Sequence, residues 1–173
     1  MPVLHPRPST LSRAAFVETY GGIYEHSPWV AEAVHDAGLG GADAPEDLAA
    51  RMAAVVDAAG DAAKLTLLRA HPELAGKLAI AGSLTAQSTA EQAGAGLDQC
   101  SAEEFAEFTR LNADYTARFG FPFIIAVAGL DRHDILNAFR QRAGHDPAVE
   151  FATALMQVHR IARLRLSAMA RQR

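Results

Sequence analysis

Apolar and polar positions alternate along most of this chain with the period of an α-helix. Proline, glycine and capping side chains mark where each helical segment begins and ends. Ser27 before Pro28 is a predicted N-cap with proline at the first helical position, and Ser101 with Glu104 is a predicted capping box. The predicted helices cover residues 11–20, 29–37, 46–59, 61–69, 101–119, 131–143 and 147–170.

Residues 121–129 depart from this pattern, because they form a continuous apolar run with glycine on both sides. The run is too short for its period to distinguish a strand from a helix. Since the sequence has no second strand-like run to pair with it, we interpret it as a buried turn with a helix start, or as an extended segment. The sequence therefore predicts an all-α fold: a single-domain, compact bundle of about seven to nine helices over residues 1–173, with residues 1–9 as a loose N-terminal tail.

Arg165 lies on the apolar stripe of the last predicted helix, together with Leu155, Val158 and Ala162. A buried guanidinium needs an anion or several acceptors, since an unpaired buried charge costs several kcal/mol. Two readings stay open from the residues alone: a structural ion pair with a carboxylate on a neighbouring helix, or a site for an anionic ligand.

Composition and charge exclude several classes of protein. Sixteen basic and 20 acidic residues give a net charge of −4, which argues against nucleic-acid binding. No apolar run approaches the roughly 18 residues of a membrane span, and the first residues do not resemble a signal peptide. Cys100 is the only cysteine, so an internal disulfide is impossible. We expect an intracellular domain without a membrane or nucleic-acid partner.

Common catalytic motifs are absent from the sequence. Glu32 and His35 form a single Glu-x-x-His pattern, whereas helical di-iron sites need two copies and further carboxylates. The sequence also lacks the Gly-x-Ser-x-Gly motif of serine hydrolases and the phosphate-binding loop of nucleotide-binding proteins. We therefore predict no metal site.

The middle of the chain holds the remaining candidate chemistry. His71 lies between two predicted helices, where Pro72 restricts the backbone, and an imidazole transfers protons near neutral pH. The alternative is a capping or surface histidine. Ser88 and Glu91 have capping-box spacing, so the alternative for both is simple helix capping. The residues alone indicate a helical protein with a possible histidine, glutamate and arginine site.

Several blocks of this sequence resemble the OHCU decarboxylases, which act on 2-oxo-4-hydroxy-4-carboxy-5-ureidoimidazoline (OHCU), the last intermediate between urate and allantoin. The resemblance extends from about residue 11 to residue 169. It implies an all-helical, usually dimeric enzyme that needs no metal or organic cofactor and uses a histidine as its acid. The blocks are YEHSPWVAE at 24–32, HPELAGK at 71–77, Ser88-x-x-Glu91-Gln92, FGFPFI at 119–124 and IARLRL at 161–166.

The resemblance also assigns residues one position at a time. The family's histidine matches His71, its essential glutamate matches Glu91, and its substrate-holding arginine matches Arg165. Two positions depart from the family: Ala128 stands where relatives often carry a lysine or arginine, and Cys100 where they often carry an aliphatic residue. The positions that match the substrate pocket are Pro72, Ser88, Thr89, Ala90, Glu91, Gln92, Phe123, Ile124, Ile125, Ala126 and Val127.

The resulting hypothesis is a cofactor-independent decarboxylase that converts OHCU to (S)-allantoin, the last step of the urate-to-allantoin pathway. Backbone N–H groups of residues 124–127 are predicted to bind oxygens of the substrate ring. The resemblance and the absence of a peroxisomal Ser-Lys-Leu end predict a homodimer in the cytoplasm of a bacterium. Two alternatives remain: a catalytically silent helical binding module of the same fold, and a metal-dependent hydrolase of a ureide.

Overall fold

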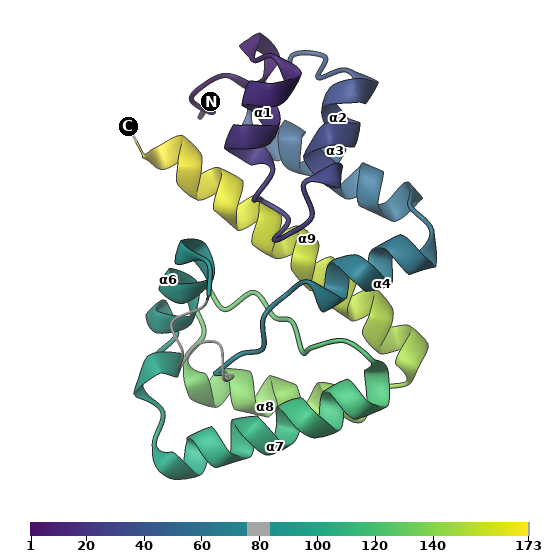
Figure 1. The fold of residues 1–173 in the computed structure, drawn as a ribbon. Helices are drawn as coiled ribbons and strands as arrows, with labels where there is room; N and C mark the ends of the chain where they lie inside the picture. Colours follow the sequence, from purple (N-terminus) through teal and green to yellow (C-terminus); the bar gives the residue numbers. More distant parts are fainter. Residues whose placement is uncertain (76–83, 173) are drawn as a thin grey trace. The chain divides into compact units, whose positions relative to one another are not determined.

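A computed structural model describes residues 1–75 and 84–172 of the chain. Helices and connecting segments make up this part, without a strand, so the prediction of an all-α fold is confirmed. None of its helices is long and apolar enough to cross a membrane. The elements are η1 (Pro8–Thr10), α1 (Arg13–Tyr20), α2 (Trp29–Ala37), α3 (Pro45–Ala58), α4 (Asp61–Arg69), α6 (Ala86–Gly94), η2 (Leu97–Gln99), α7 (Ala102–Phe119), α8 (Arg132–Arg142) and α9 (Pro147–Arg171) (Figure 1).

The chain folds into two compact units. Unit 1 comprises Met1–Ala70 with Val158–Arg173, and unit 2 comprises His71–Gln157. Helix α9 begins in unit 2 and continues into unit 1 as one helix (Figure 1). The single domain expected over residues 1–173 stays a prediction.

The ends of α7 and α8 follow the predicted capping chemistry. Ser101 accepts a hydrogen bond from the backbone N–H of Glu104, and the Glu104 side chain accepts one from the backbone N–H of Ser101. Gly120 ends α7 in the left-handed region, with φ of 78°. Asp131 caps α8 with the same reciprocal arrangement toward Asp134. These bonds are local in sequence, so the pattern of residues is enough to predict them.

The predicted cap at Ser27 is wrong, and the alternative that Ser88 and Glu91 serve only as helix caps is also not observed. Ser27 donates its hydroxyl to the Glu25 carbonyl at 3.3 Å, and Pro28 is the residue before α2. In α6 the cap is Thr85, whose hydroxyl oxygen accepts from the Ser88 backbone N–H at 3.2 Å. Ser88 and Glu91 therefore lie inside the helix and do not cap it.

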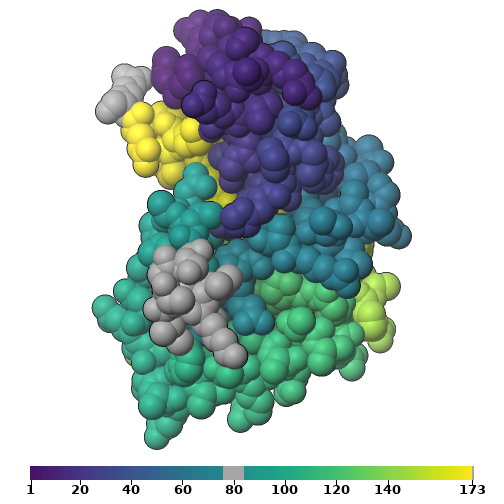
Figure 2. Space-filling model, viewed as in Figure 1, coloured from purple at the N-terminus to yellow at the C-terminus, as the bar shows by residue number. Residues whose placement is uncertain are grey.

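The first residues of the chain are packed against unit 1, so the loose tail expected for residues 1–9 is wrong. Leu4 is fully buried, and its backbone N–H donates to the Asp43 carbonyl at 2.8 Å. Ser9 donates both its backbone N–H and its hydroxyl to the Asp43 carboxylate, at 2.8 Å each. These hydrogen bonds hold the pKa of Asp43 below its ordinary value. Figure 2 shows the N-terminal part of unit 1 in purple, beside the blue atoms of later residues of the same unit.

The apolar run after α7 is extended and buried, which confirms one of the two predicted forms. Residues 122–127 have neither helix nor strand structure, and most of their side chains are buried. Phe123 stacks on Phe139 of α8, with ring centroids 4.0 Å apart and planes at 13°. Tyr115 of α7 contacts the Phe123 ring edge-on at 5.5 Å. This aromatic cluster fixes the run in the core of unit 2.

Candidate active site

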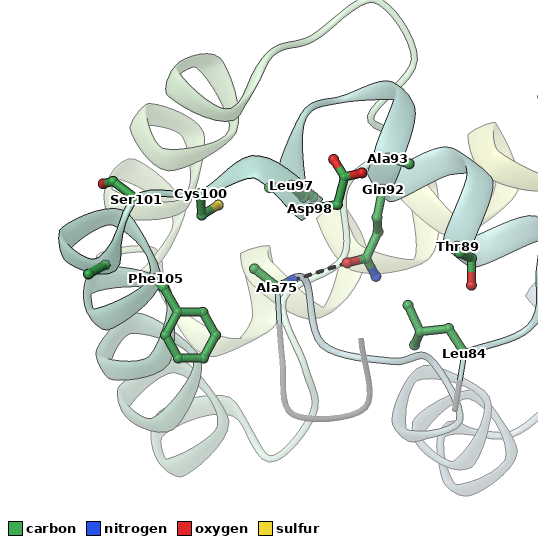
Figure 3. A pocket seen from close by; sticks show the side chains of 11 residues that line it. Ala75, Leu84, Thr89, Gln92, Ala93, Leu97, Asp98, Cys100, Ser101 and Phe105 are labelled. Atoms are coloured by element: carbon green, nitrogen blue, oxygen red, sulfur yellow. Dashed lines mark hydrogen bonds between the residues drawn. The ribbon is translucent and has the colours of Figure 1, made fainter. Parts of the chain in front are cut away.

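His71 lies in the segment that follows α4, and only 8% of it is exposed. Amide side chains hold the residues that follow. Gln92 of α6 accepts from the Ala75 backbone N–H at 3.1 Å, as Figure 3 shows, and donates to the Glu73 carbonyl at 3.4 Å. Asn112 of α7 donates to the Leu74 carbonyl at 2.9 Å. The histidine segment is thereby attached to two helices of unit 2.

The predicted run from Ser88 to Gln92 occupies α6, so its side chains point in different directions. Ser88 and Gln92 are buried, and Glu91 is half-buried. Thr89 and Ala90 are exposed, because successive positions on a helix are rotated by about 100°. The amide oxygen and the amide nitrogen of Gln92 each contact the histidine segment, so Gln92 is a positioning side chain for that segment. Gly76 and Lys77, which end the predicted block 71–77, lie outside the described residues.

The extended segment 123–127 is held by two side chains that the sequence analysis did not identify. Arg142 of α8 donates from Nη1 to the Ile124 carbonyl at 2.7 Å, and its guanidinium lies 4.4 Å from the centre of the Phe123 ring. Gln157 of α9 accepts from the Ala126 backbone N–H at 3.0 Å. The Ala126 N–H, predicted to bind a substrate oxygen, is therefore occupied by Gln157 in this structure.

Arg142 also belongs to a buried polar cluster around Glu150, which is 0% exposed. Arg142 donates to its Oε1 from Nε at 2.8 Å and from Nη2 at 2.6 Å, and the Tyr115 hydroxyl donates to the same oxygen. His145 Nδ1 lies 3.0 Å from Oε2. Burial raises the pKa of Tyr115, and its hydrogen bond to Glu150 raises it further. The cluster compensates the buried charges and makes Arg142 a structural residue.

Arg165 lies in unit 1 and is 6% exposed, so the stripe correctly predicts its burial. Its Nη2 lies 3.6 Å from Oε2 of Glu25, and its Nη1 donates to the Ile23 carbonyl at 3.3 Å. Glu25, itself 2% exposed, belongs to the segment between α1 and α2 and not to a helix. The sequence analysis missed Glu25, although it lies in the quoted block 24–32. The sequence does offer a signal for Glu25, namely a carboxylate in a largely apolar segment, which indicates a buried partner for a cation.

Tyr24, which lies between Ile23 and Glu25, is held by two further side chains, His159 and Asp57. Its hydroxyl oxygen lies 2.7 Å from Nδ1 of His159, and Nε2 of His159 lies 2.9 Å from Oδ1 of Asp57. A neutral imidazole satisfies both contacts, with Nε2–H donating to the carboxylate and Nδ1 accepting from the tyrosine. Burial raises the pKa of Tyr24, with a further contribution from the Asp57 charge. Residues 23–25 are thus fixed from α9 on two sides, by His159 and Arg165.

A cavity of about 440 Å³ lies in unit 2 beside α6 (Figure 3). It includes Thr89 and Gln92 from the predicted pocket. Ala93 also lines the cavity. Since Glu91 lies roughly 200° around the helix from Ala93, the Glu91 side chain points away from this cavity. Burial raises the pKa of the Cys100 thiol in its wall. The lining residues are Ala75, Leu84, Thr89, Gln92, Ala93, Leu97, Asp98, Cys100, Ser101, Ala102 and Phe105.

The candidate residues offer proton transfer and anion binding. His71 supplies an imidazole, Glu91 a carboxylate and Arg165 a guanidinium with a planar set of donors. His71 and Glu91 belong to unit 2 and Arg165 to unit 1, and their action on one substrate stays a prediction. Within the residues that the structure describes, no group of three or more His, Cys, Asp or Glu side chains is arranged to hold a metal ion.

Comparison with known proteins relates nearly the whole chain to one family. The sequence model described as "OHCU decarboxylase" matches residues 9–167. A 2-oxo-4-hydroxy-4-carboxy-5-ureidoimidazoline decarboxylase of Haloferax volcanii is 42% identical over 153 residues, covering 88% of each chain. A decarboxylase of the same name from Amia calva is 40% identical over 158 residues, covering 91% of this chain and 89% of the relative.

Among solved structures, a crystal structure of (S)-allantoin synthase superposes with a TM-score of 0.74 and 35% sequence identity. The match covers 94% of this chain and 52% of that chain, so this chain spans about half the length of that synthase.

Proposed function

Because the chain belongs to the OHCU decarboxylase family, we propose that it catalyses the decarboxylation of OHCU to (S)-allantoin. The observation that carries this proposal is the family match over residues 9–167. The chemistry available from His71, Glu91 and Arg165 is compatible with it. In urate degradation this reaction is the last step before allantoin.

The substrate carries its own electron sink. Its carboxylate is attached to a hydroxyl-bearing carbon next to a C=N bond. When the bond to the carboxylate breaks and CO2 leaves, the electron pair forms a C=C bond and the C=N electrons move to nitrogen. The nitrogen takes up one proton. Protonation of the carbon that carries the ureido group, with loss of the hydroxyl proton, then gives allantoin. The protein therefore needs to hold the substrate, move protons and choose one face for protonation.

The three candidate residues divide these tasks. Arg165 binds oxygens of the anionic substrate, since a guanidinium donates two parallel hydrogen bonds to a carboxylate or to neighbouring carbonyls. His71 transfers the proton, because an imidazole gives and accepts protons near neutral pH. Glu91 orients the imidazole or accepts from the ureido N–H groups. Pro72, Ser88 and the segment 123–127 shape the pocket around these groups.

The direct test is the rate at which freshly generated OHCU disappears. The wild-type protein is expected to accelerate this loss in proportion to its concentration, and EDTA is expected to leave the rate unchanged. A rate equal to that of spontaneous decay would contradict the proposal. A rate that falls with EDTA and returns with added metal would instead support the metal-dependent hydrolase.

The role of His71 is tested with His71→Asn, which keeps the size and polarity of the side chain. Loss of proton transfer is expected to lower kcat by roughly 10²–10⁴-fold, with (S)-allantoin binding largely retained. His133→Asn is a matched control, because His133 is exposed at the start of α8. Equal kcat values for the two variants would remove His71 from the proposed mechanism.

We also propose that the protein is a homodimer in the cytoplasm of a bacterial cell. The usual assembly of the family supports the first part, and the alanine- and arginine-rich composition supports the second. Relatives in Haloferax volcanii and Amia calva extend the family to archaea and animals. Sedimentation velocity is expected to give twice the mass of one chain, and the mass of one chain would contradict the dimer.

A further inference from the structure

Gln157 of α9 has an orientation that the structure fixes. Its Oε1 accepts from the Ala126 backbone N–H at 3.0 Å. A backbone N–H only donates, so the side-chain oxygen must face Ala126 and the NH2 group must face the other way. The amide of Gln157 therefore has one defined direction relative to the extended segment.

The segment that fixes Gln157 is itself held in place. Two residues before Ala126, the Ile124 carbonyl accepts from Nη1 of Arg142 at 2.7 Å. Arg142 is 7% exposed and is bound to the fully buried Glu150. The backbone on either side of Ile125 is thus anchored by side chains of two helices. A donor attached to such a frame loses little conformational freedom when a ligand binds.

The NH2 group of Gln157 is available for a ligand. Among residues 1–75 and 84–172, its hydrogen bonding involves Oε1 alone, and the side chain is half-buried, not sealed in the core. Amide N–H groups in such a position bind water or an acceptor of a ligand. The Ala126 N–H, predicted to bind a substrate oxygen, is covered by the same side chain.

We propose that Gln157 is a substrate-binding residue, whose Nε2 donates to a carbonyl or carboxylate oxygen of the substrate in place of the covered Ala126 N–H. This inference rests on the proposed function, in which the segment 123–127 lines the pocket for OHCU. The substrate is rich in oxygen acceptors and carries a negative charge, which a neutral amide donor matches and a carboxylate at the same position would repel.

The test is Gln157→Glu, which keeps the shape of the side chain and an oxygen for Ala126 but replaces the donor with a charged acceptor. We expect KM for OHCU and Kd for (S)-allantoin to rise by roughly 10- to 100-fold, with a smaller change in kcat. The matched control is Gln141→Glu, the same change at an exposed position of α8, with KM and Kd expected to stay at their wild-type values. Wild-type values of both constants in Gln157→Glu would overturn the proposal.

Exchange of the Ala126 amide hydrogen separates binding from a purely structural role. In Gln157→Glu this amide is expected to stay protected, because an oxygen still accepts from it, while ligand binding weakens. Faster exchange at Ala126 in that variant would assign the effect to the backbone and contradict the proposal. If Gln157→Glu does not fold, Gln157→Asn decides: its shorter side chain withdraws the donors, so Kd is expected to rise, and an unchanged Kd overturns the inference.

Failure of this inference can be told apart from failure of the proposed function. If the wild-type protein accelerates OHCU loss and Gln157→Glu has an unchanged KM, only the role of Gln157 is wrong. If the wild-type protein neither accelerates OHCU loss nor binds (S)-allantoin, the proposed function is wrong, and the inference that rests on it is withdrawn.

Discussion

Each unit of the chain buries an arginine, and the two are equally hidden but differently bound. Arg142 in unit 2 is 7% exposed and Arg165 in unit 1 is 6% exposed. The guanidinium of Arg142 contacts Glu150 at 2.6 and 2.8 Å and the Ile124 carbonyl at 2.7 Å. Two contacts of Arg165 within unit 1 are longer, at 3.6 Å to Glu25 and 3.3 Å to the Ile23 carbonyl.

This difference shows that burial alone does not identify a functional arginine. Arg142 donates a short, charge-assisted hydrogen bond to Glu150, which is itself 0% exposed. Both side chains are therefore needed for the stability of the fold. A contact of 3.6 Å is longer than a hydrogen bond, so its loss costs less. We therefore expect substitutions of Arg142 to act mainly on stability. From the proposed role of Arg165 in holding the substrate, we expect its substitutions to act mainly on binding.

The largest expected effect is on the stability of Arg142→Met. This substitution leaves the Glu150 carboxylate buried without its cation, which lowers the free energy of unfolding by about 3–5 kcal/mol. Urea denaturation measures this change. The control is Arg118→Met, because Arg118 also donates to a carbonyl and lies over a phenylalanine ring but is exposed. Equal losses in the two variants would contradict the structural role of Arg142.

A second effect is expected on ligand binding by Arg165→Ala. Removal of the guanidinium is expected to weaken (S)-allantoin binding by about 2–5 kcal/mol, measured by isothermal titration calorimetry. Its free energy of unfolding should fall less than that of Arg142→Met, because the ion pair with Glu25, at 3.6 Å, is longer than the one between Arg142 and Glu150, at 2.6 Å. A large fall in melting temperature with unchanged affinity would show that Arg165 is a structural ion pair like Arg142.

The smallest expected effect is the acid sensitivity of the N-terminal segment of unit 1. Hydrogen bonds from Ser9 lower the pKa of Asp43 in the folded state, so they stabilise the fold above its unfolded pKa. This contribution is lost as the pH falls through the lowered pKa, below about pH 4. Asp43→Asn should therefore be less stable than wild type at neutral pH, and the difference should shrink in acid. A constant difference in urea midpoint across this range would contradict the assignment.

The sequence predicted the features that depend on neighbouring residues. The caps at Ser101 and Asp131 and the end of α7 at Gly120 follow from side chains within four positions of the helix ends. The burial of Arg165 follows from a single helical stripe. These features depend on the local sequence alone and can be predicted without knowing their partners elsewhere in the chain.

Features that depend on distant partners were missed. Leu4 is held by Asp43, and Ala126 is held by Gln157, 31 positions away. No local pattern marks either pair. The aromatic residues around segment 121–127 do not predict the course of its backbone. That course depends on two hydrogen bonds: the Ile124 carbonyl accepts from Arg142, and the Ala126 N–H donates to Gln157. The roles of His71, Glu91 and Arg165 rest on family resemblance and stay predictions.

The most direct test of the account is the stereochemistry of the allantoin that the wild-type protein produces. Spontaneous decay of OHCU protonates both faces and gives a racemic product, whereas a shaped pocket protonates one face. We predict that circular dichroism of the product grows with enzyme concentration and has the sign of (S)-allantoin. Allantoin that forms without circular dichroism at every enzyme concentration would contradict the proposal that this chain is an OHCU decarboxylase.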